Sequence, residues 1–220
     1  ILDHGRSLEE VVRAIHLGIS SVMFDGSCLP YEENVRRTRE VVAVAHAAGV
    51  DVEGELGAIP GSAVSAEGGG TDAAFTDPGR AVDFVRSTGV DALAISFGNV
   101  HGVYRGSPRL DLERVRRTSS LVDVPLVMHG GSGLGGGDYA ELVDCGIAKF
   151  GYYTALARGA CEHLRALLCG AGRKDTAYHD LLSGTIDYFY EETKKLLDYL
   201  RAPGHAAPGH AAPGTAKEEK

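Results

Sequence analysis

Short apolar runs alternate along the chain with longer amphipathic segments, which is the pattern of a parallel β/α fold. The apolar runs predict six strands, at residues 1–3, 20–24, 50–56, 92–97, 125–128 and 147–150. The amphipathic segments predict helices at residues 7–17, 31–48, 77–89, from 111 onward, 138–145 and 154–168. Strands separated by helices of this length form parallel βαβ units.

Capping residues mark where several of these helices begin. Ser7 and Glu10 have the spacing of a capping box. Asp77 is followed directly by Pro78, an N-cap and a first-turn proline. These signals support the helix boundaries that the periodicity predicts.

The number of strands bears on the fold class. A closed (β/α)8 TIM barrel needs eight strands, and the first run already ends in polar residues typical of a strand's carboxyl end. We therefore expect two βα units and most of a third strand to precede Ile1 in the complete protein. Residues 1–201 then form strands three to eight of an α/β TIM barrel with a C-terminal helix over about 175–200. Residues 202–220 repeat Ala, Pro, Gly and His, which predicts a disordered tail.

Composition and charge limit the function classes. The chain has 220 residues, 44% of them hydrophobic, which suffices for one sizeable core. A formal net charge of −8 argues against nucleic acid or an anionic membrane as a partner, because both require a basic surface. Four cysteines without CxxC spacing, and no leading signal segment or long apolar span, favour a cytoplasmic protein.

Three histidines stand at the ends of apolar runs, and a glycine follows each of them. They are His4, His101 and His129. The carboxyl ends of parallel barrel strands meet at one face, where catalytic groups gather. Three imidazoles with room left for a substrate oxygen are the ligand set of a catalytic zinc ion. A lone strand-end histidine is more often a hydrogen-bonded structural residue, so the repetition carries the prediction of a metal site.

Small residues follow the third histidine, at Gly130, Gly131 and Ser132. Their backbone N–H groups can approach an anion, and Thr154 at a predicted helix start adds a second N–H cluster. These loops predict a phosphate site. The alternative is that the glycines only shape turns.

In their order along the chain, these motifs resemble the class II, zinc-dependent fructose-bisphosphate and tagatose-bisphosphate aldolases. That family carries Asp-His-Gly, Asp-Gly-Ser, Glu-Leu-Gly, His-Gly and His-Gly-Gly-Ser, which stand here at residues 3–5, 25–27, 55–57, 101–102 and 129–132. The resemblance runs from Leu2 to about Leu168. It implies a zinc ion held by three histidines, a second or alternative metal site with two carboxylates, and room for a monovalent cation. The implied metal residues are His4, His101, His129, Asp25 and Glu55.

The resemblance also implies a reaction and an assembly. The reaction is the cleavage or formation of a ketose bisphosphate, such as fructose 1,6-bisphosphate in glycolysis, with dihydroxyacetone phosphate and an aldehyde as the products. The assembly is a homodimer or homotetramer. Zinc stabilises the enediolate as a Lewis acid, and Asp3 fits the acid that moves a proton at the C4 oxygen. The alternative for Asp3 is a hydrogen-bond partner of a ligand histidine. The implied substrate and phosphate residues are Gly102, Gly130, Gly131, Ser132, Gly151, Tyr152, Tyr153 and Thr154.

Two segments depart from the family pattern. The family's Gly-Gly-x-Glu-Asp loop is replaced at residues 60–65 by Pro-Gly-Ser-Ala-Val-Ser, and the first acid after it, Glu67, becomes the expected catalytic base. In Lys-x-Asn-x-x-Thr, Gly151 replaces the asparagine, and we expect Lys149 to pair with a neighbouring carboxylate. A missing acid–base group typically costs about 10²–10⁴-fold in rate. A catalytically degenerate barrel that binds metal and a phosphorylated metabolite, or an inactive truncated fragment, are therefore the alternatives.

Overall fold

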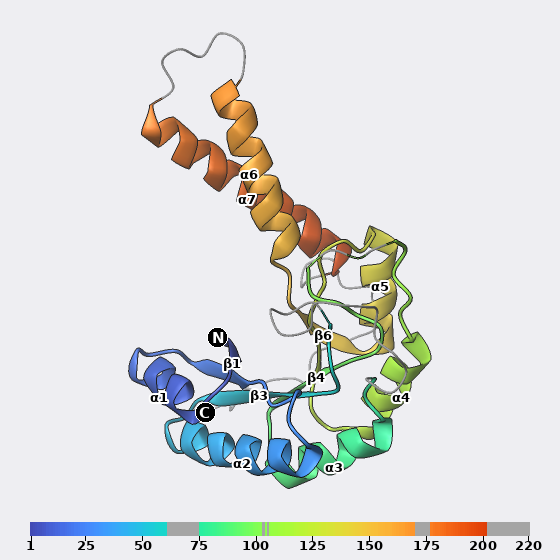
Figure 1. Ribbon diagram of the computed structural model, residues 1–220. Helices are drawn as coiled ribbons and strands as arrows, with labels where there is room; N and C mark the ends of the chain where they lie inside the picture. Colours follow the sequence, from blue (N-terminus) through green and yellow to red (C-terminus); the bar gives the residue numbers. More distant parts are fainter. Residues whose placement is uncertain (61–74, 103, 105, 170–176, 202–220) are drawn as a thin grey trace, which may run out of the picture. The chain divides into compact units, whose positions relative to one another are not determined.

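The computed structural model describes residues 1–60, 75–102, 104, 106–169 and 177–201 (Figure 1). The chain divides into two compact units, and each is described by itself. The first unit consists of Ile1–Leu134 and Leu142–Ala155, and the second of Gly135–Glu141 and the chain from Leu156 onward. Every described residue of the predicted site belongs to the first unit.

The first unit contains a six-stranded parallel sheet whose strands follow one another in chain order. This arrangement is an α/β half-barrel, and it agrees with a partial TIM barrel. The two additional βα units stay a prediction. The strands are β1 (Leu2–Gly5), β2 (Ser21–Phe24), β3 (Asp51–Leu56), β4 (Ala92–Ile95), β5 (Leu126–Met128) and β6 (Ile147–Phe150). All six predicted strands are confirmed, although β1 extends through the first histidine and β4 ends two residues earlier than expected.

Helices follow the strands as the periodicity predicts. They are α1 (Leu8–His16), α2 (Tyr31–Ala47), α3 (Pro78–Thr88), α4 (Leu112–Leu121) and α5 (Gly136–Cys145). The predicted N-caps form, since Ser7 Oγ accepts a hydrogen bond from the Glu10 N–H at 3.2 Å and Asp77 accepts one from the Arg80 N–H at 2.9 Å. The return bond of the predicted capping box differs, because the Glu10 carboxylate accepts from the Arg6 N–H at 2.8 Å. Side-chain caps of this kind stabilise a helix start by about 1 kcal/mol.

The two faces of the sheet have different compositions, because successive side chains of a strand point to opposite faces. One face packs against α1 to α4 in a large apolar cluster (Figure 1). Its fully buried members include Val11, Val22, Phe24, Val41, Val52, Phe84, Leu93, Ile95, Val115, Leu126 and Met128. We call this the outer face. Among the described residues, the other, inner face carries a small apolar cluster of Met23, Ala94 and Val127, together with the buried acids Glu53 and Glu55.

The second unit contains most of α6 (Thr154–Cys169) and α7 (Tyr178–Tyr199), a helix that the sequence predicted over about 175–200. A Cβ at Gly159 would lie 1.8 Å from Tyr188 Oη, so glycine is what lets these helices approach. No residue of α7 is buried. The predicted tail, 202–220, lies outside the described residues, and none of the described helices is long and apolar enough to cross a membrane.

Candidate active site

The three strand-end histidines meet at the carboxyl ends of the strands. One ring nitrogen of each lies within 4.8 Å of the others. The ring centroid of His4 is 4.9 Å from that of His101 and 4.5 Å from that of His129, and the latter two are 5.7 Å apart. The structure thus brings the predicted ligands together at a spacing that could hold one metal ion.

An irregularity in β1 lets two consecutive residues reach this site. Neighbours on a regular strand point to opposite faces. Here the register of β1 against β2 shifts between Leu2 and Gly5, and His4 has a φ of 49°, in the left-handed region that a residue other than glycine rarely adopts. Both Asp3 and His4 consequently line the same cavity. Backbone strain of this kind gathers at functional sites.

Asp25 fixes the orientation of the first histidine. Its Oδ2 lies 2.9 Å from His4 Nδ1, and its Oδ1 accepts hydrogen bonds from the Ser27 N–H at 3.1 Å and the Ser27 hydroxyl at 2.6 Å. Burial alone would raise the pKa of Asp25, but these hydrogen bonds outweigh it and lower that pKa to about 2. Burial alone would lower the pKa of His4, but the hydrogen bond to Asp25 and the charges of the nearby carboxylates together raise it. Since Nδ1 is engaged, Nε2 is the nitrogen of His4 that remains for a metal ion.

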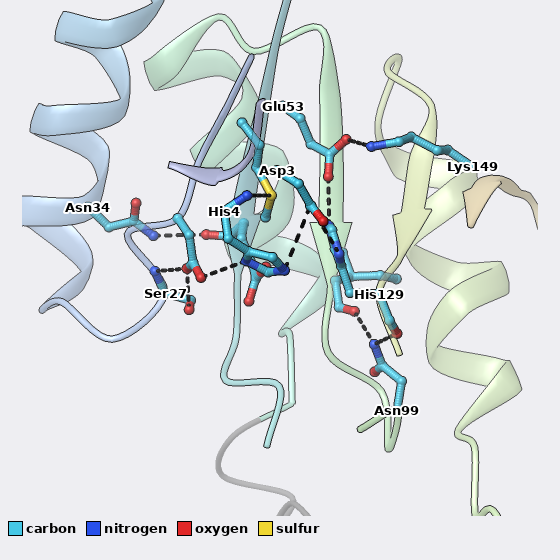
Figure 2. Close-up of polar contacts among 12 residues, drawn as sticks. Asp3, His4, Ser27, Asn34, Glu53, Asn99, His129 and Lys149 are labelled. Atoms are coloured by element: carbon cyan, nitrogen blue, oxygen red, sulfur yellow. Dashed lines mark hydrogen bonds and ion pairs between the residues drawn. The ribbon is translucent and has the colours of Figure 1, made fainter. Parts of the chain in front are cut away.

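Glu53 holds the third histidine, and sequence reasoning missed it. Figure 2 shows Glu53 between His129 and Lys149: Oε1 lies 2.8 Å from His129 Nε2, and Lys149 Nζ donates to Oε2. The expected pairing of Lys149 with a carboxylate is therefore confirmed. Burial would raise the pKa of Glu53, but the bonds to His129 and Lys149 outweigh it and keep that pKa below its ordinary value. The available signal was position, since Glu53 shares the inward side of β3 with Glu55.

His101 is unlike the other two histidines. Among the described residues, neither of its buried ring nitrogens has a hydrogen-bond partner. Burial, together with the nearby imidazoles of His4 and His129, lowers its pKa to about 4. The ring is therefore neutral near pH 7, as a metal ligand must be. An unpartnered buried nitrogen in a cluster of imidazoles fits a metal ion that is shared by the three rings.

A second group of possible ligands also forms as predicted. One ligand atom each from His4, Asp25 and Glu55 lies within 4.8 Å of the others. The Glu55 side chain is buried, its Oε2 has no hydrogen-bond partner among the described residues, and burial beside Asp25 raises its pKa well above the ordinary value. Because this group shares His4 with the three-histidine group, the two could serve as neighbouring positions for a metal.

Asp3 lies beside the three-histidine group with its side chain 67% exposed. Its Oδ1 is 3.9 Å from His4 Nε2 and 4.0 Å from His129 Nδ1 (Figure 2). Both distances exceed hydrogen-bond length. In this structure Asp3 is therefore not a hydrogen-bond partner of either histidine, and its carboxylate is available to a molecule in the cavity.

A cavity of about 740 Å³ opens beside the histidines, a size typical of small-molecule sites. All the predicted substrate residues except Gly131 line it, namely Gly102, Gly130, Ser132, Gly151, Tyr152, Tyr153 and Thr154. The exception has a physical reason, because the Gly131 N–H donates to the Gly151 carbonyl at 2.9 Å and is not available to an anion. Position 130 has room only for glycine, since a Cβ there would lie 2.0 Å from the Val100 carbonyl oxygen.

Two arginines that sequence reasoning did not select also line the cavity, Arg6 and Arg37. Arg6 follows the first histidine by two residues, which was the available signal. Arg37 lies on α2, where its Nε donates to Glu33. The expected base, Glu67, lies outside the described residues, so its placement is untested.

Gly151 packs directly against the third histidine. A Cβ at this position would lie 3.1 Å from His129 Nδ1. Gly151 is not among the glycines with positive φ, so a side chain would meet a steric rather than a backbone obstacle. The asparagine that the family pattern places here would therefore crowd the ring.

Comparisons with known proteins agree with this geometry. The profile of the family described as Fructose-bisphosphate aldolase class-II matches residues 1–205. The Escherichia coli K12 protein YdjI, which is described as uncharacterized, is 43% identical over 159 residues, or 72% of this chain and 56% of YdjI. The chain thus spans just over half the length of this relative.

Solved structures share the fold. The crystal structure of the YdjI aldolase from Escherichia coli K12 matches with a TM-score of 0.79 and 34% identity, over 93% of this chain and 70% of that one. A putative fructose-1,6-biphosphate aldolase from Coccidioides immitis matches with a TM-score of 0.80 and 29% identity, over 92% and 71% of the two chains. With its site geometry and its match to the family profile, the chain belongs to the class-II fructose-bisphosphate aldolase family.

Proposed function

We propose that this chain carries the active site of a zinc-dependent aldolase. Its reaction is the cleavage or formation of a ketose bisphosphate, fructose 1,6-bisphosphate or a related sugar, with dihydroxyacetone phosphate and an aldehyde as the other partners. One observation carries the proposal: among the described residues, neither buried ring nitrogen of His101 has a hydrogen-bond partner, and the ring lies beside those of His4 and His129. Leaving a buried polar group unpaired costs about 1–3 kcal/mol, and a shared metal ion would remove that cost.

Each of the three histidines would contribute one ring nitrogen to the metal. His4 would contribute Nε2 and His129 would contribute Nδ1, because the other nitrogen of each ring is bonded to a carboxylate. His101 would contribute one of its unpartnered nitrogens. When bound, zinc would supply a Lewis acid that stabilises negative charge developing on the substrate oxygens. Asp25 and Glu55, with His4, would form the second or alternative position.

Proton transfer is proposed for two acids. Asp3 has an exposed carboxylate at the cavity wall, from which it can move a proton at the aldehyde or C4 oxygen of the substrate. Glu67 is proposed as the base that removes a proton from dihydroxyacetone phosphate. This role rests on the family pattern alone.

Phosphate binding is proposed for the loops after β5 and β6. The small residues Gly130 and Ser132 and the helix start at Thr154 line the cavity, and helix N-termini favour anions. Arg6 and Arg37 add positive charge to the same cavity in a chain of net charge −8. Because Arg37 is paired with Glu33 and the acids Asp3 and Asp25 also line the cavity, Arg6 is the cation that we propose for the phosphate.

A second candidate function is binding of metal and a phosphorylated metabolite without turnover. The observation that favours it is Gly151, which replaces the family's substrate-contacting asparagine at a position where an added Cβ would lie 3.1 Å from His129 Nδ1. Under this alternative the metal and phosphate positions are kept while the chemistry is lost.

The deciding experiment measures cleavage of fructose 1,6-bisphosphate by the chain before and after metal removal. We expect a chelator to abolish cleavage and zinc to restore it. Borohydride should trap no covalent adduct, because the amine of Lys149 is bonded to Glu53 and no Schiff base is required. Zinc binding without cleavage would favour the second candidate, and trapping on Lys149 would refute the metal mechanism. His46→Ala, which alters a histidine outside the cavity lining, is the matched control.

Self-association is a further part of the proposal. Helix α7 exposes several large apolar side chains, and such a surface is typical of interaction sites. They are Leu182, Ile186, Phe189, Tyr190 and Leu197. Sedimentation should report a homodimer or homotetramer.

A further inference from the structure

We propose that Glu53 is a positioning residue, whose carboxylate, held by Lys149, fixes the His129 ring so that Nδ1 faces His4 and His101. This inference rests on the proposed metal site, but it concerns the ring's orientation and tautomer, which can be measured without a metal. Nothing in the aldolase motifs of the sequence points to Glu53.

The Glu53 side chain reaches His129 and Lys149 across β4, which carries small residues at the crossing. Glu53 lies on β3, His129 directly follows β5 and Lys149 lies on β6, so β4 stands between the carboxylate and its partners. On β4 the residues that pair with Glu53 and Glu55 are Ala92 and Ala94. Because both have only a methyl group, the Glu53 side chain can reach across the inner face (Figure 2). A larger residue at either position would block that path.

The bond to Glu53 decides which nitrogen of His129 carries the hydrogen. An ionised carboxylate can only accept hydrogen bonds, so Nε2, at 2.8 Å from Oε1, must be the donor. The lone pair then lies on Nδ1, the nitrogen on the side of Asp3. Lys149 Nζ donates to the second carboxylate oxygen, so Glu53 stands in an ion pair as the carboxylate partner of an ammonium group. This is the arrangement in which a carboxylate orients a metal-binding histidine.

Stability alone does not explain the pair. The ion pair of Glu53 with Lys149 joins a side chain that is 2% exposed to one that is 39% exposed, and the desolvation of a buried carboxylate can exceed what such a pair gains. Among the described residues, both carboxylate oxygens bond to side chains only, so Glu53 secures no backbone group.

A second carboxylate–histidine pair, between Asp91 and His46 of α2, has a structural role that differs from that of Glu53. Asp91 Oδ2 lies 2.8 Å from His46 Nε2, and it also accepts a hydrogen bond from the Val52 N–H at 2.7 Å. Asp91 stands just before β4, at the amino ends of the strands. It therefore ties a helix to the sheet, a structural task that Glu53 does not have.

The experiment has a metal-free and a metal-bound arm. In the metal-free arm, nitrogen NMR of the chain reports the His129 tautomer, with the signal assigned by its absence in His129→Asn. We expect the Nε2–H form in the unsubstituted chain and loss of that single form in Glu53→Ala. In the second arm, zinc affinity is measured by competition, and the visible spectrum of bound Co²⁺ reports the ligand geometry. Glu53→Ala should weaken zinc binding about 10–100-fold and alter the Co²⁺ spectrum.

Two further variants separate positioning from folding. Glu53→Gln combined with Lys149→Met keeps a hydrogen-bond acceptor without buried charge, so it should retain the Nε2–H form and most of the affinity even where Glu53→Ala folds poorly. Asp91→Asn, the matched control, should leave both readouts unchanged. Unchanged tautomer and affinity in Glu53→Ala would overturn the inference. Failure of the unsubstituted chain to bind zinc would instead overturn the proposed function, while the metal-free arm still decides what holds the ring.

Discussion

The two faces of the same sheet follow opposite physical rules. The side chain of Val52 packs into the apolar cluster of the outer face, whereas that of Glu53, one residue later, is a buried charge on the inner face. The outer face gains free energy by removing apolar area from water. The inner face holds ionisable groups that are costly to bury. We infer that the outer face stabilises the fold and that the inner face is arranged for binding, so substitutions on the two faces should separate unfolding from loss of metal.

The largest effect is expected on the outer face. Phe84→Ala should lower the free energy of unfolding by about 3–5 kcal/mol, because the ring is fully buried and its edge occupies the space above Gly54. Urea unfolding of the metal-free chain measures this. Phe189→Ala on α7, where the ring is 39% exposed, should cost far less. Zinc affinity of the folded fraction should stay unchanged, and a parallel loss of affinity would show that the two faces are not separable.

The next effect is expected at the unpartnered histidine. His101→Phe should weaken zinc binding by more than 100-fold, because a ligand is lost and not merely a residue that orients one. The free energy of unfolding of the metal-free chain should rise by about 1–3 kcal/mol, since two buried nitrogens without partners disappear. The absence of partners holds for the described part of the chain, and urea unfolding without metal tests it directly. Calorimetric titration with zinc gives the affinity. A loss of stability comparable to that of Phe84→Ala would contradict this account of the inner face.

Local signals made much of this architecture predictable from the sequence. The alternation of apolar runs and amphipathic segments, with caps such as Ser7 and Asp77, gave the strands and helices nearly at their observed bounds. The repeated His-Gly at strand ends brought three residues to one place because parallel strands present their carboxyl ends at the same edge. Each of these signals is read within a few residues.

The contacts that were missed join residues far apart in the chain. Glu53 is separated by 76 positions from His129 and by 96 from Lys149, and no local pattern reveals such a pairing. The engagement of the Gly131 N–H with the Gly151 carbonyl is equally non-local. Asp3 and His4 were both predicted in the site, but the irregular strand that brings consecutive residues to one cavity was not.

The free energy of unfolding of the metal-free chain should fall in two steps as the pH is lowered, one from His101 and one from Asp25. The pKa of His101 is lowered from 6.5 to about 4 by burial and by its imidazole neighbours. Between these values the unfolded chain binds a proton that the folded chain does not, so stability falls as the pH drops from 6.5 to 4. For Asp25, hydrogen bonds outweigh burial and lower the pKa from 3.8 to about 2, which adds a loss in that lower range.

The thermal midpoint of the metal-free chain, followed from pH 8 to pH 2, measures both losses. His101→Phe should remove the upper loss, and Asp25→Asn should reduce the lower one, to which the lowered pKa of Glu53 also contributes. The raised pKa of His4 has the opposite effect, a loss of stability as the pH rises. An unchanged upper loss in His101→Phe would mean that another group titrates there.

The smallest effect is expected where the glycine meets the third histidine. The added Cβ of Gly151→Ala would lie 3.1 Å from His129 Nδ1, so the ring must shift by a few tenths of an ångström, but its bond to Glu53 resists that shift. We expect a several-fold loss of zinc affinity with little change in unfolding, and no effect from Gly137→Ala, where a Cβ meets open space. The sharper test combines Gly151→Ala with Glu53→Ala. Residues that act on one ring should be energetically coupled. Once Glu53 no longer holds the ring, the alanine at position 151 should cost less than it does alone, whereas strictly additive losses would show that Glu53 and Gly151 do not act on zinc binding through His129.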